Sequence, residues 1–265
     1  MSDPLALDWQ ALVLASALVV IAIGTSRGFR LGLERDYLWA SLRTVAQLLL
    51  VGHALLWIFE QQAIWWVLVA FAVMLASASV TAARRGAHRL PGLLGAAAVS
   101  ITLSCGLTTV AVTALIVRVD PWWAPRYFLP LAGMIVGNAM NAAALTAERL
   151  RAEASAQRAH IEQLLALGAT PRQASAAAVR AAIRAGMIPM INAMLTVGLV
   201  SLPGMMTGQI LAGADPSGAA RYQILVMFML AGSTTISAVV LGSLVYRRLF
   251  TDAWQLRHEL LSASS

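Results

Sequence analysis

Four polar side chains inside long apolar stretches have the types and spacing to bind a solute within a membrane. Asn138 and Asn141 lie three residues apart, on one face of a helix. Asn192 and Thr196 lie four residues apart and share a face in the same way. Such groups can also bond a neighbouring helix, which stabilises a membrane bundle by roughly 0.6–2 kcal/mol per hydrogen bond. Helix–helix bonding is the simpler role for any one of them, but their concentration in two stretches favours contact with a solute.

The segment SLPGMMTGQILAG at residues 201–213 is a second candidate, because it follows an apolar stretch. Proline lacks a backbone donor and glycine permits unusual backbone angles, so we expect a helix to break at Pro203 and Gly204. Broken helices at membrane depth persist where they line a cavity, and transporters use them to present backbone groups to cargo. The alternative is a tight turn that re-enters the outer surface. The predicted path residues are Asn138, Asn141, Asn192, Pro203, Gly204, Met205, Met206, Gly208 and Gln209.

The sulfur-containing side chains are the third group of candidate functional residues, because sulfur can bind soft metal ions. Met187, Met190 and Met194 recur at i, i+3 and i+7, on one helical face. Thioethers bind Cu(I) best and harder ions weakly, but a methionine stripe is more often adaptable packing. Cys105 is the one cysteine, and His53 is the one histidine deep in an apolar stretch. The residue pattern therefore assigns no metal site.

The chain lacks the groups that three classes of protein need. All 12 acidic residues lie in tails, connections or span ends, so no carboxylate is placed in mid-membrane to carry a coupling ion. All 19 basic residues are arginine, and without lysine the chain cannot contain the GxxxxGK[ST] phosphate loop of an ATPase. No nucleophile–base motif indicates an enzyme. The net charge of +7 is typical of membrane-protein loops and does not require a nucleic-acid partner.

These side chains must be positioned by membrane helices. The chain is 59% hydrophobic and only 12% charged, whereas a soluble domain carries roughly 25% charged residues. Apolar runs long enough to cross a bilayer, about 20 residues each, predict an all-α polytopic fold with about seven spans. The expected spans are 6–25, 38–59, 63–82, 93–117, 127–147, 187–211 and 223–246.

Arginine placement predicts the orientation of this single permease domain, residues 1–265. Basic-rich connections at 26–37, 83–92 and 148–186 alternate with basic-poor ones. Because cytoplasmic loops collect arginine, we expect the N-terminus outside and the C-terminus in the cytoplasm.

The connection at 148–186 is the one substantial segment outside the membrane. No glycine or proline interrupts residues 138–167, so the fifth span should continue outward as one helix and stop at Gly168. Thr170, Pro171 and Gln173 then predict a capped restart. The second helix should run over about 171–185 and end near Gly186. We call residues 148–186 the elbow; the alternative is an ordinary loop.

Several segments resemble one family: LAGMIVGNAMNAAAL (131–145), LLALGATPRQA (164–174), IPMINAMLTVGLVSLPGMMTGQILAGADP (188–216) and RYQILVMFMLAGSTTIS (221–237). They are similar to the FetB (YbbM) family, the membrane permease subunits of bacterial iron-export ABC transporters, which also resemble plant aluminium-tolerance permeases. The resemblance covers most of residues 127–246 and, more weakly, residues 41–55.

That resemblance implies a transport subunit of the bacterial inner membrane, with no cofactor of its own. ATP and Mg would bind a separate cytoplasmic ATP-binding subunit, and the permease would form a homodimer. The elbow would couple the two subunits. Its expected coupling residues are Glu162, Leu164, Leu165, Leu167, Gly168, Ala169, Thr170 and Pro171.

The expected function is therefore export of iron or a related metal, with a secondary transporter, a channel or a membrane scaffold as alternatives. Iron prefers carboxylate, imidazole or thiolate ligands, and the spans offer few of them. A chelated metal or an organic molecule stays open as cargo.

Overall fold

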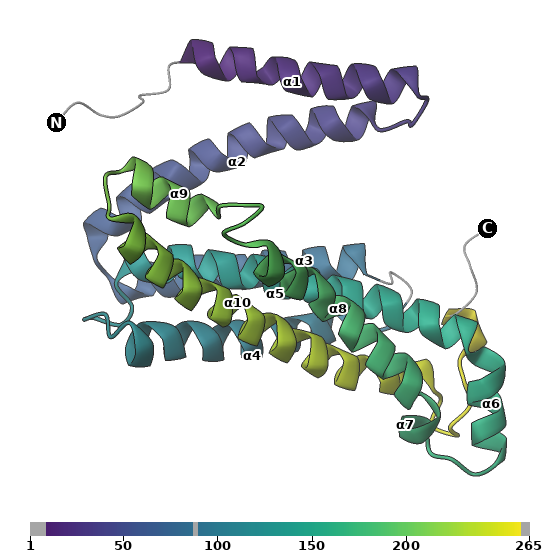
Figure 1. Ribbon diagram of the computed structural model, residues 1–265. Coiled ribbons are helices and arrows are strands. Elements are labelled where there is room, and N and C mark those ends of the chain that lie inside the picture. Colours follow the sequence, from purple (N-terminus) through teal and green to yellow (C-terminus); the bar gives the residue numbers. More distant parts are fainter. Residues whose placement is uncertain (1–8, 87–89, 261–265) are drawn as a thin grey trace. The chain divides into compact units, whose positions relative to one another are not determined.

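The computed structural model describes residues 9–86 and 90–260, and apart from two isolated bridges its regular structure over these ranges is helical (Figure 1). The predicted all-α class is confirmed. Seven of the described helices are long and apolar enough to cross a membrane, as predicted. They are Trp9–Gly28, Glu34–Gln61, Ile64–Arg85, Leu93–Ile116, Pro125–Ala156, Ala176–Thr196 and Pro216–Leu249. Asp3, Asp8 and Arg89, which also entered the sequence argument, lie outside the described residues.

The chain divides into two compact units, one ending at Gln62 and the other beginning at Ala63. The single permease domain predicted over residues 1–265 stays a prediction. The first unit holds helices α1 (Trp9–Gly28) and α2 (Glu34–Gln61). Ser26 joins them, since its hydroxyl donates to Glu34 Oε1 at 3.1 Å and accepts from the Leu33 amide at 3.1 Å.

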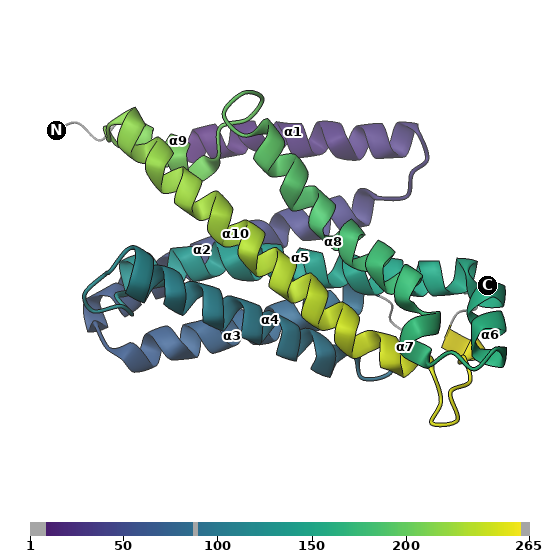
Figure 2. The same cartoon turned by 60° about the horizontal axis from the view of Figure 1, so that its bottom comes forward.

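The second unit is a helix bundle built around α5 (Pro125–Ala156) and α10 (Pro216–Val245). Helices α3 (Ile64–Arg85), α4 (Leu93–Val110) and α8 (Ala176–Thr196) pack against them. A π-helical segment, Ala111–Ile116, extends α4. Figure 2 shows α10 crossing in front of α5.

Small side chains allow the central helices to approach closely. Ala132, Ala139 and Ala147 on α5 are fully buried. The Ser237 hydroxyl on α10 donates to the Ala139 carbonyl oxygen at 3.0 Å. Close contact between small residues is the usual basis of helix association in membranes, where lipid removes most of the hydrophobic driving force.

The predicted helix end near Gly186 is wrong. Helix α8 runs without interruption from Ala176 to Thr196, through Gly186 and Pro189. Gly186 is buried, and a Cβ there would collide with Thr146 Oγ1 and lie 2.9 Å from the Ala142 carbonyl oxygen. The glycine therefore serves close packing of α8 on α5, and the elbow continues into the sixth span as one helix.

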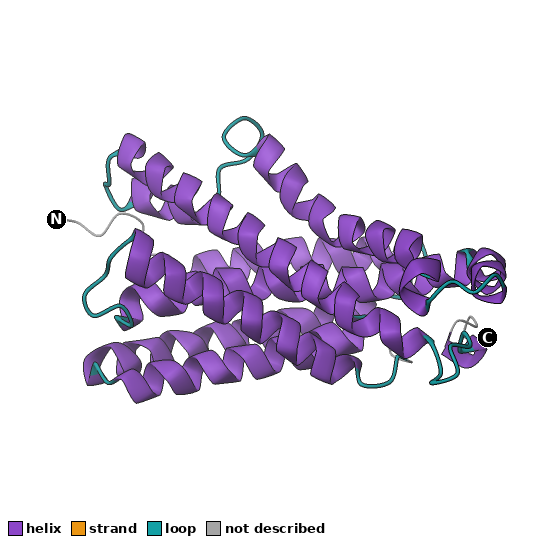
Figure 3. Cartoon of the chain, turned by 90° about the horizontal axis from the view of Figure 1, so that it is seen from below, coloured by secondary structure: helices purple, strands orange, loops and turns teal. Residues whose placement is uncertain are grey.

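The break in the sixth span lies earlier and is longer than predicted. Helix α8 ends at Thr196, a turn occupies residues 197–203, and α9 (Gly204–Leu211) follows with Pro203 as its N-cap. Gly198 adopts φ +84° in this turn, and its amide donates to the Ser201 carbonyl oxygen at 2.9 Å. Pro203 and Gly204 thus start a helix after the break. Figure 3 shows the turn as a wide loop.

The elbow contains two further short helices, α6 (Arg158–Ala166) and α7 (Pro171–Ala174). The expected continuous helix through residue 167 is wrong, since α5 ends at Ala156 and Gln157 separates it from α6. Gly168 does terminate the helical run, with φ +88°. The predicted restart is confirmed as a capping box between Thr170 and Gln173.

We expect Thr170→Ala to loosen α7 locally. The Thr170 hydroxyl accepts from the Gln173 amide at 3.3 Å, and Gln173 Oε1 accepts from the Thr170 amide at 2.9 Å. Losing an N-cap costs about 1 kcal/mol, so the Gln173 amide should exchange hydrogen about fivefold faster. Thr25→Ala is the control, because its hydroxyl only donates to a carbonyl within α1. Unchanged exchange in Thr170→Ala would mean that the box does not hold α7.

Candidate docking elbow and transport cavities

The C-terminal segment of the chain lies beside the elbow. After α10, a turn of 3₁₀ helix (Tyr246–Leu249) leads into a small hairpin, residues 250–256, and then to His258–Leu260. Phe250 and Leu256 form an antiparallel bridge and are both buried. The Arg257 guanidinium pins the hairpin by donating to the Phe250 carbonyl oxygen at 3.2 Å.

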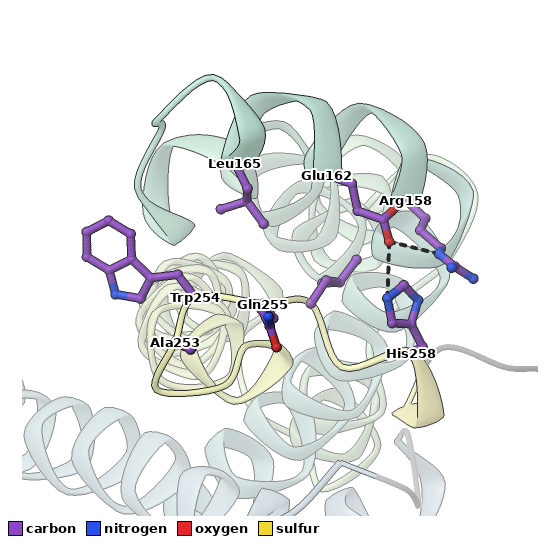
Figure 4. Close-up of a pocket in the computed structure, with 8 residues that line it drawn as sticks. Arg158, Glu162, Leu165, Ala253, Trp254, Gln255 and His258 are labelled. Atoms are coloured by element: carbon purple, nitrogen blue, oxygen red, sulfur yellow. Dashed lines mark hydrogen bonds and ion pairs between the residues drawn. The ribbon is translucent and has the colours of Figure 1, made fainter.

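A cavity of about 740 Å³ separates α6 from this hairpin (Figure 4). Glu162 connects α6 with the C-terminal segment at this cavity. Its Oε1 lies 3.0 Å from Arg158 Nε and 3.3 Å from His258 Nε2. Figure 4 shows His258 at one end of the cavity and Trp254 at the other. The lining residues are Arg158, Glu162, Leu165, Ala253, Trp254, Gln255, Leu256 and His258.

Trp254 stands at the tip of the hairpin, between two cavities. It also lines a second one, of about 430 Å³, together with Thr170, Pro171 and Arg172 of the elbow. Its side chain is 54% exposed and its backbone has φ +61°. A non-glycine residue rarely adopts that conformation, and positions that hold it are often functional. The Trp254 amide donates to the Thr251 carbonyl oxygen at 3.0 Å, which fixes the tip.

The predicted coupling residues are divided among these surfaces. Glu162 and Leu165 line the first cavity, and Thr170 and Pro171 line the second. Leu164 packs against the buried core, and Gly168 supplies the left-handed turn beside Ala169. Leu167, at the C-cap of α6, is 84% exposed.

Sequence reasoning missed Trp254 and His258 as neighbours of the elbow. No periodicity connects residues near 254 with residues near 160. The available signal was Trp254, the one tryptophan that follows the last predicted span.

The structure brings two of the predicted path residues together. Asn138 and Asn141 line a cavity of about 130 Å³ with Pro189 and Met190 of α8. The Asn138 amide donates to the Met134 carbonyl oxygen at 2.9 Å within its own helix. Asn192 is exposed and lines none of the described cavities.

Met206 is the one residue of the predicted segment 203–209 that lines a described cavity. That cavity, of about 410 Å³, lies among α8, α9 and α10. Its one polar lining side chain is Gln223, on α10. Met205 instead packs against the hydrophobic core, and Pro203 caps α9. Gly204, Gly208 and Gln209 face none of the cavities described.

Within the described residues, no group of three or more His, Cys, Asp or Glu side chains could hold a metal ion. The carboxylate, imidazole and thiolate ligands that iron prefers are therefore not assembled in the described part of this single chain.

Seven helices that are long and apolar enough to cross a membrane define a multi-pass membrane protein. The chain belongs to the uncharacterised protein family UPF0014, whose model matches residues 9–250. It is 42% identical over 250 residues to a UPF0014 membrane protein of Synechocystis, covering 94% of this chain and 96% of that protein.

Two other relatives carry more specific names. The chain is 38% identical over 247 residues to the probable iron export permease protein FetB of Escherichia coli, covering 93% of this chain and 94% of that protein. It is 37% identical over 251 residues to the Arabidopsis protein ALUMINUM SENSITIVE 3, covering 94% and 90%. The resemblance to the FetB family that the sequence segments indicated is confirmed. No solved structure matches the chain.

Proposed function

We propose that this chain is the permease subunit of an ABC transporter that exports iron or a related metal. A separate ATP-binding subunit would hydrolyse ATP, with Mg, and would bind at the elbow. The observation that carries the proposal is the elbow itself, which joins α5 and α8, the two helices that contribute most of the Asn138–Asn141 cavity. The name of the Escherichia coli relative supports export of iron.

The elbow is built to transmit movement. Gln157 separates α6 from α5, and Ser175 separates α7 from α8. The Ser175 hydroxyl donates to the Pro171 carbonyl oxygen at 2.7 Å, which ties the junction of α7 and α8 to the start of α7. A displacement of the elbow by a bound ATPase would tilt α8 relative to α5, and the cavity between them would change width.

The orientation belongs to the same proposal. Arginines gather at the elbow end of the spans, which favours the cytoplasm for the elbow and for the C-terminus. A bacterial inner membrane is the expected location, and two permease copies would pair with two ATP-binding subunits. The lysine-free sequence supports a separate ATPase, since the chain itself cannot form a phosphate loop.

Inside-out vesicles that contain this chain and its ATPase partner test the function, because export then appears as uptake. Iron uptake should require ATP, fail with a non-hydrolysable analogue and persist with an uncoupler. Uptake abolished by the uncoupler would indicate a secondary transporter. A stable ATPase complex without flux of iron, chelated iron or aluminium would indicate a scaffold or another cargo.

A further inference from the structure

Three methionines from three different helices line the cavity of about 410 Å³. Met194 lies near the end of α8, Met206 lies on α9, and Met227 lies on α10. Helix α9 lies along the first turns of α10, and α8 also packs on α10 (Figure 2). Tertiary structure thus brings together three thioethers that no helical period in the sequence would group.

A buried polar group faces the same cavity. Gln223 is one turn before Met227 on α10 and is only 6% exposed. Its Oε1 atom has no hydrogen-bond partner. A buried, unpaired carbonyl oxygen is uncommon in folded proteins and calls for a bound water, ion or ligand, or for a functional reason. The carboxamide oxygen is an acceptor, so it suits a cation or a hydrogen-bond donor.

We propose that this pocket binds a soft monovalent cation of the Cu(I) or Ag(I) class. The ligands are the thioether sulfurs of Met194, Met206 and Met227, with the Gln223 carbonyl oxygen as a fourth donor. Thioethers select soft cations, whereas Mg²⁺, Ca²⁺ and Mn²⁺ prefer carboxylates, carbonyls and water. All four donors are neutral, so they suit an ion of single charge better than a divalent or trivalent one.

The rest of the lining is apolar. It consists of Val197 and Gly198 of the turn and Ala220, Ile224 and Phe228 of α10. These residues add no oxygen or nitrogen side-chain donor that would compete with the thioethers for a metal. The pocket is separate from the Asn138–Asn141 cavity, and the proposal does not depend on the transport function proposed above.

Silver binding to the purified full chain in detergent tests the site. All variants carry Cys105→Ala, because Cys105 supplies the chain's one thiol, and a thiolate is a strong ligand for soft metals. Silver nitrate is added in chloride-free buffer, and bound silver is counted by mass spectrometry after gel filtration. X-ray absorption then identifies the neighbouring atoms. We expect one silver ion per chain, with sulfur neighbours.

Methionine-to-leucine changes keep side-chain volume, so they remove sulfur with little effect on packing. Changes outside the ligand shell already weaken metal sites by about 10–100-fold, so Met194→Leu, Met206→Leu and Met227→Leu should each weaken binding by at least about tenfold. Gln223→Leu should weaken it less. Met205→Leu, beside Met206 but outside the pocket lining, is the matched control and should bind normally.

Unchanged silver binding in the triple leucine variant overturns the proposal, as does a first shell of oxygen and nitrogen alone. A lipid held by the wild-type chain and lost in the triple variant, with no silver bound, would reassign the pocket to an apolar ligand. Selenomethionine protein tests the site without any substitution. Silver should then show selenium neighbours, and their absence overturns the proposal even if a leucine variant fails to fold.

Discussion

Trp254→Gly is expected to weaken binding of the ATP-binding subunit by about 30-fold while the permease stays folded. Tryptophan is the residue type most enriched at binding hot spots, where truncation costs about 2 kcal/mol or more. Trp254 is 54% exposed, stands between both cavities that flank the elbow, and is held at a fixed tip by the hairpin. A large, rigid, exposed aromatic beside a candidate coupling element is what a docking partner would bury.

Glycine is the informative substitute at this position. Because Trp254 has φ +61°, alanine would remove the indole and keep the backbone strain, whereas glycine adopts that angle freely. The hairpin should therefore survive, and the variant isolates the loss of the side chain. Partner affinity is measured by titrating the purified ATP-binding subunit onto the permease in nanodiscs, together with thermal unfolding of the permease alone.

Trp65→Ala is the matched control. Trp65 is 74% exposed near the start of α3, at the opposite end of the same helix from Arg85 and the predicted cytoplasmic connection. Its loss should leave partner affinity unchanged. Equal affinities for Trp254→Gly and wild type would remove the hairpin from the docking surface and leave the elbow helices, with exposed Leu167, as the candidate contact.

The spans could be predicted because their signal is local. A run of about 20 apolar residues meets the requirement of a bilayer wherever the rest of the chain lies. The Thr170 capping box was predictable for the same reason, since donor and acceptor are three residues apart. Asn138 and Asn141 also share a cavity as their spacing indicates, because both sit on α5.

Features that depend on contacts between distant segments could not be predicted. Gly186 has the local character of a helix stop, but its role is set by Thr146, forty residues earlier on another helix. The hairpin at Trp254 reaches the elbow only after α10 has crossed the bundle. The turn at 197–203 brings Met206 to the same cavity as Met194 and Met227. The Pro203–Gly204 pair predicts a break in the helix but not a turn of this length.

The close approach of α8 to α5 predicts the second large effect. Gly186→Val should destabilise the bundle by about 1–3 kcal/mol and lower the accumulation of the folded permease. A side chain at residue 186 would meet Thr146 Oγ1 and the Ala142 backbone oxygen at once. The threonine can rotate, but the backbone oxygen cannot move without moving α5. Thermal unfolding in detergent measures the loss, and Gly137→Ala, with nothing within 4 Å of its Cβ, is the control.

A double substitution separates steric contact from a change in helix propensity. Thr146→Ala removes one of the two obstacles and deletes a buried hydroxyl oxygen that has no hydrogen-bond partner, so alone it should be close to neutral. Combined with Gly186→Ala, it should recover part of the stability that Gly186→Ala loses, since residues in contact are not additive. Full additivity of the two changes would contradict steric contact as the cause. The elbow would then be joined to the sixth span by the continuity of α8 alone. The close contact of α8 with α5, through which we expect movement of the elbow to reach the cavity, would be absent.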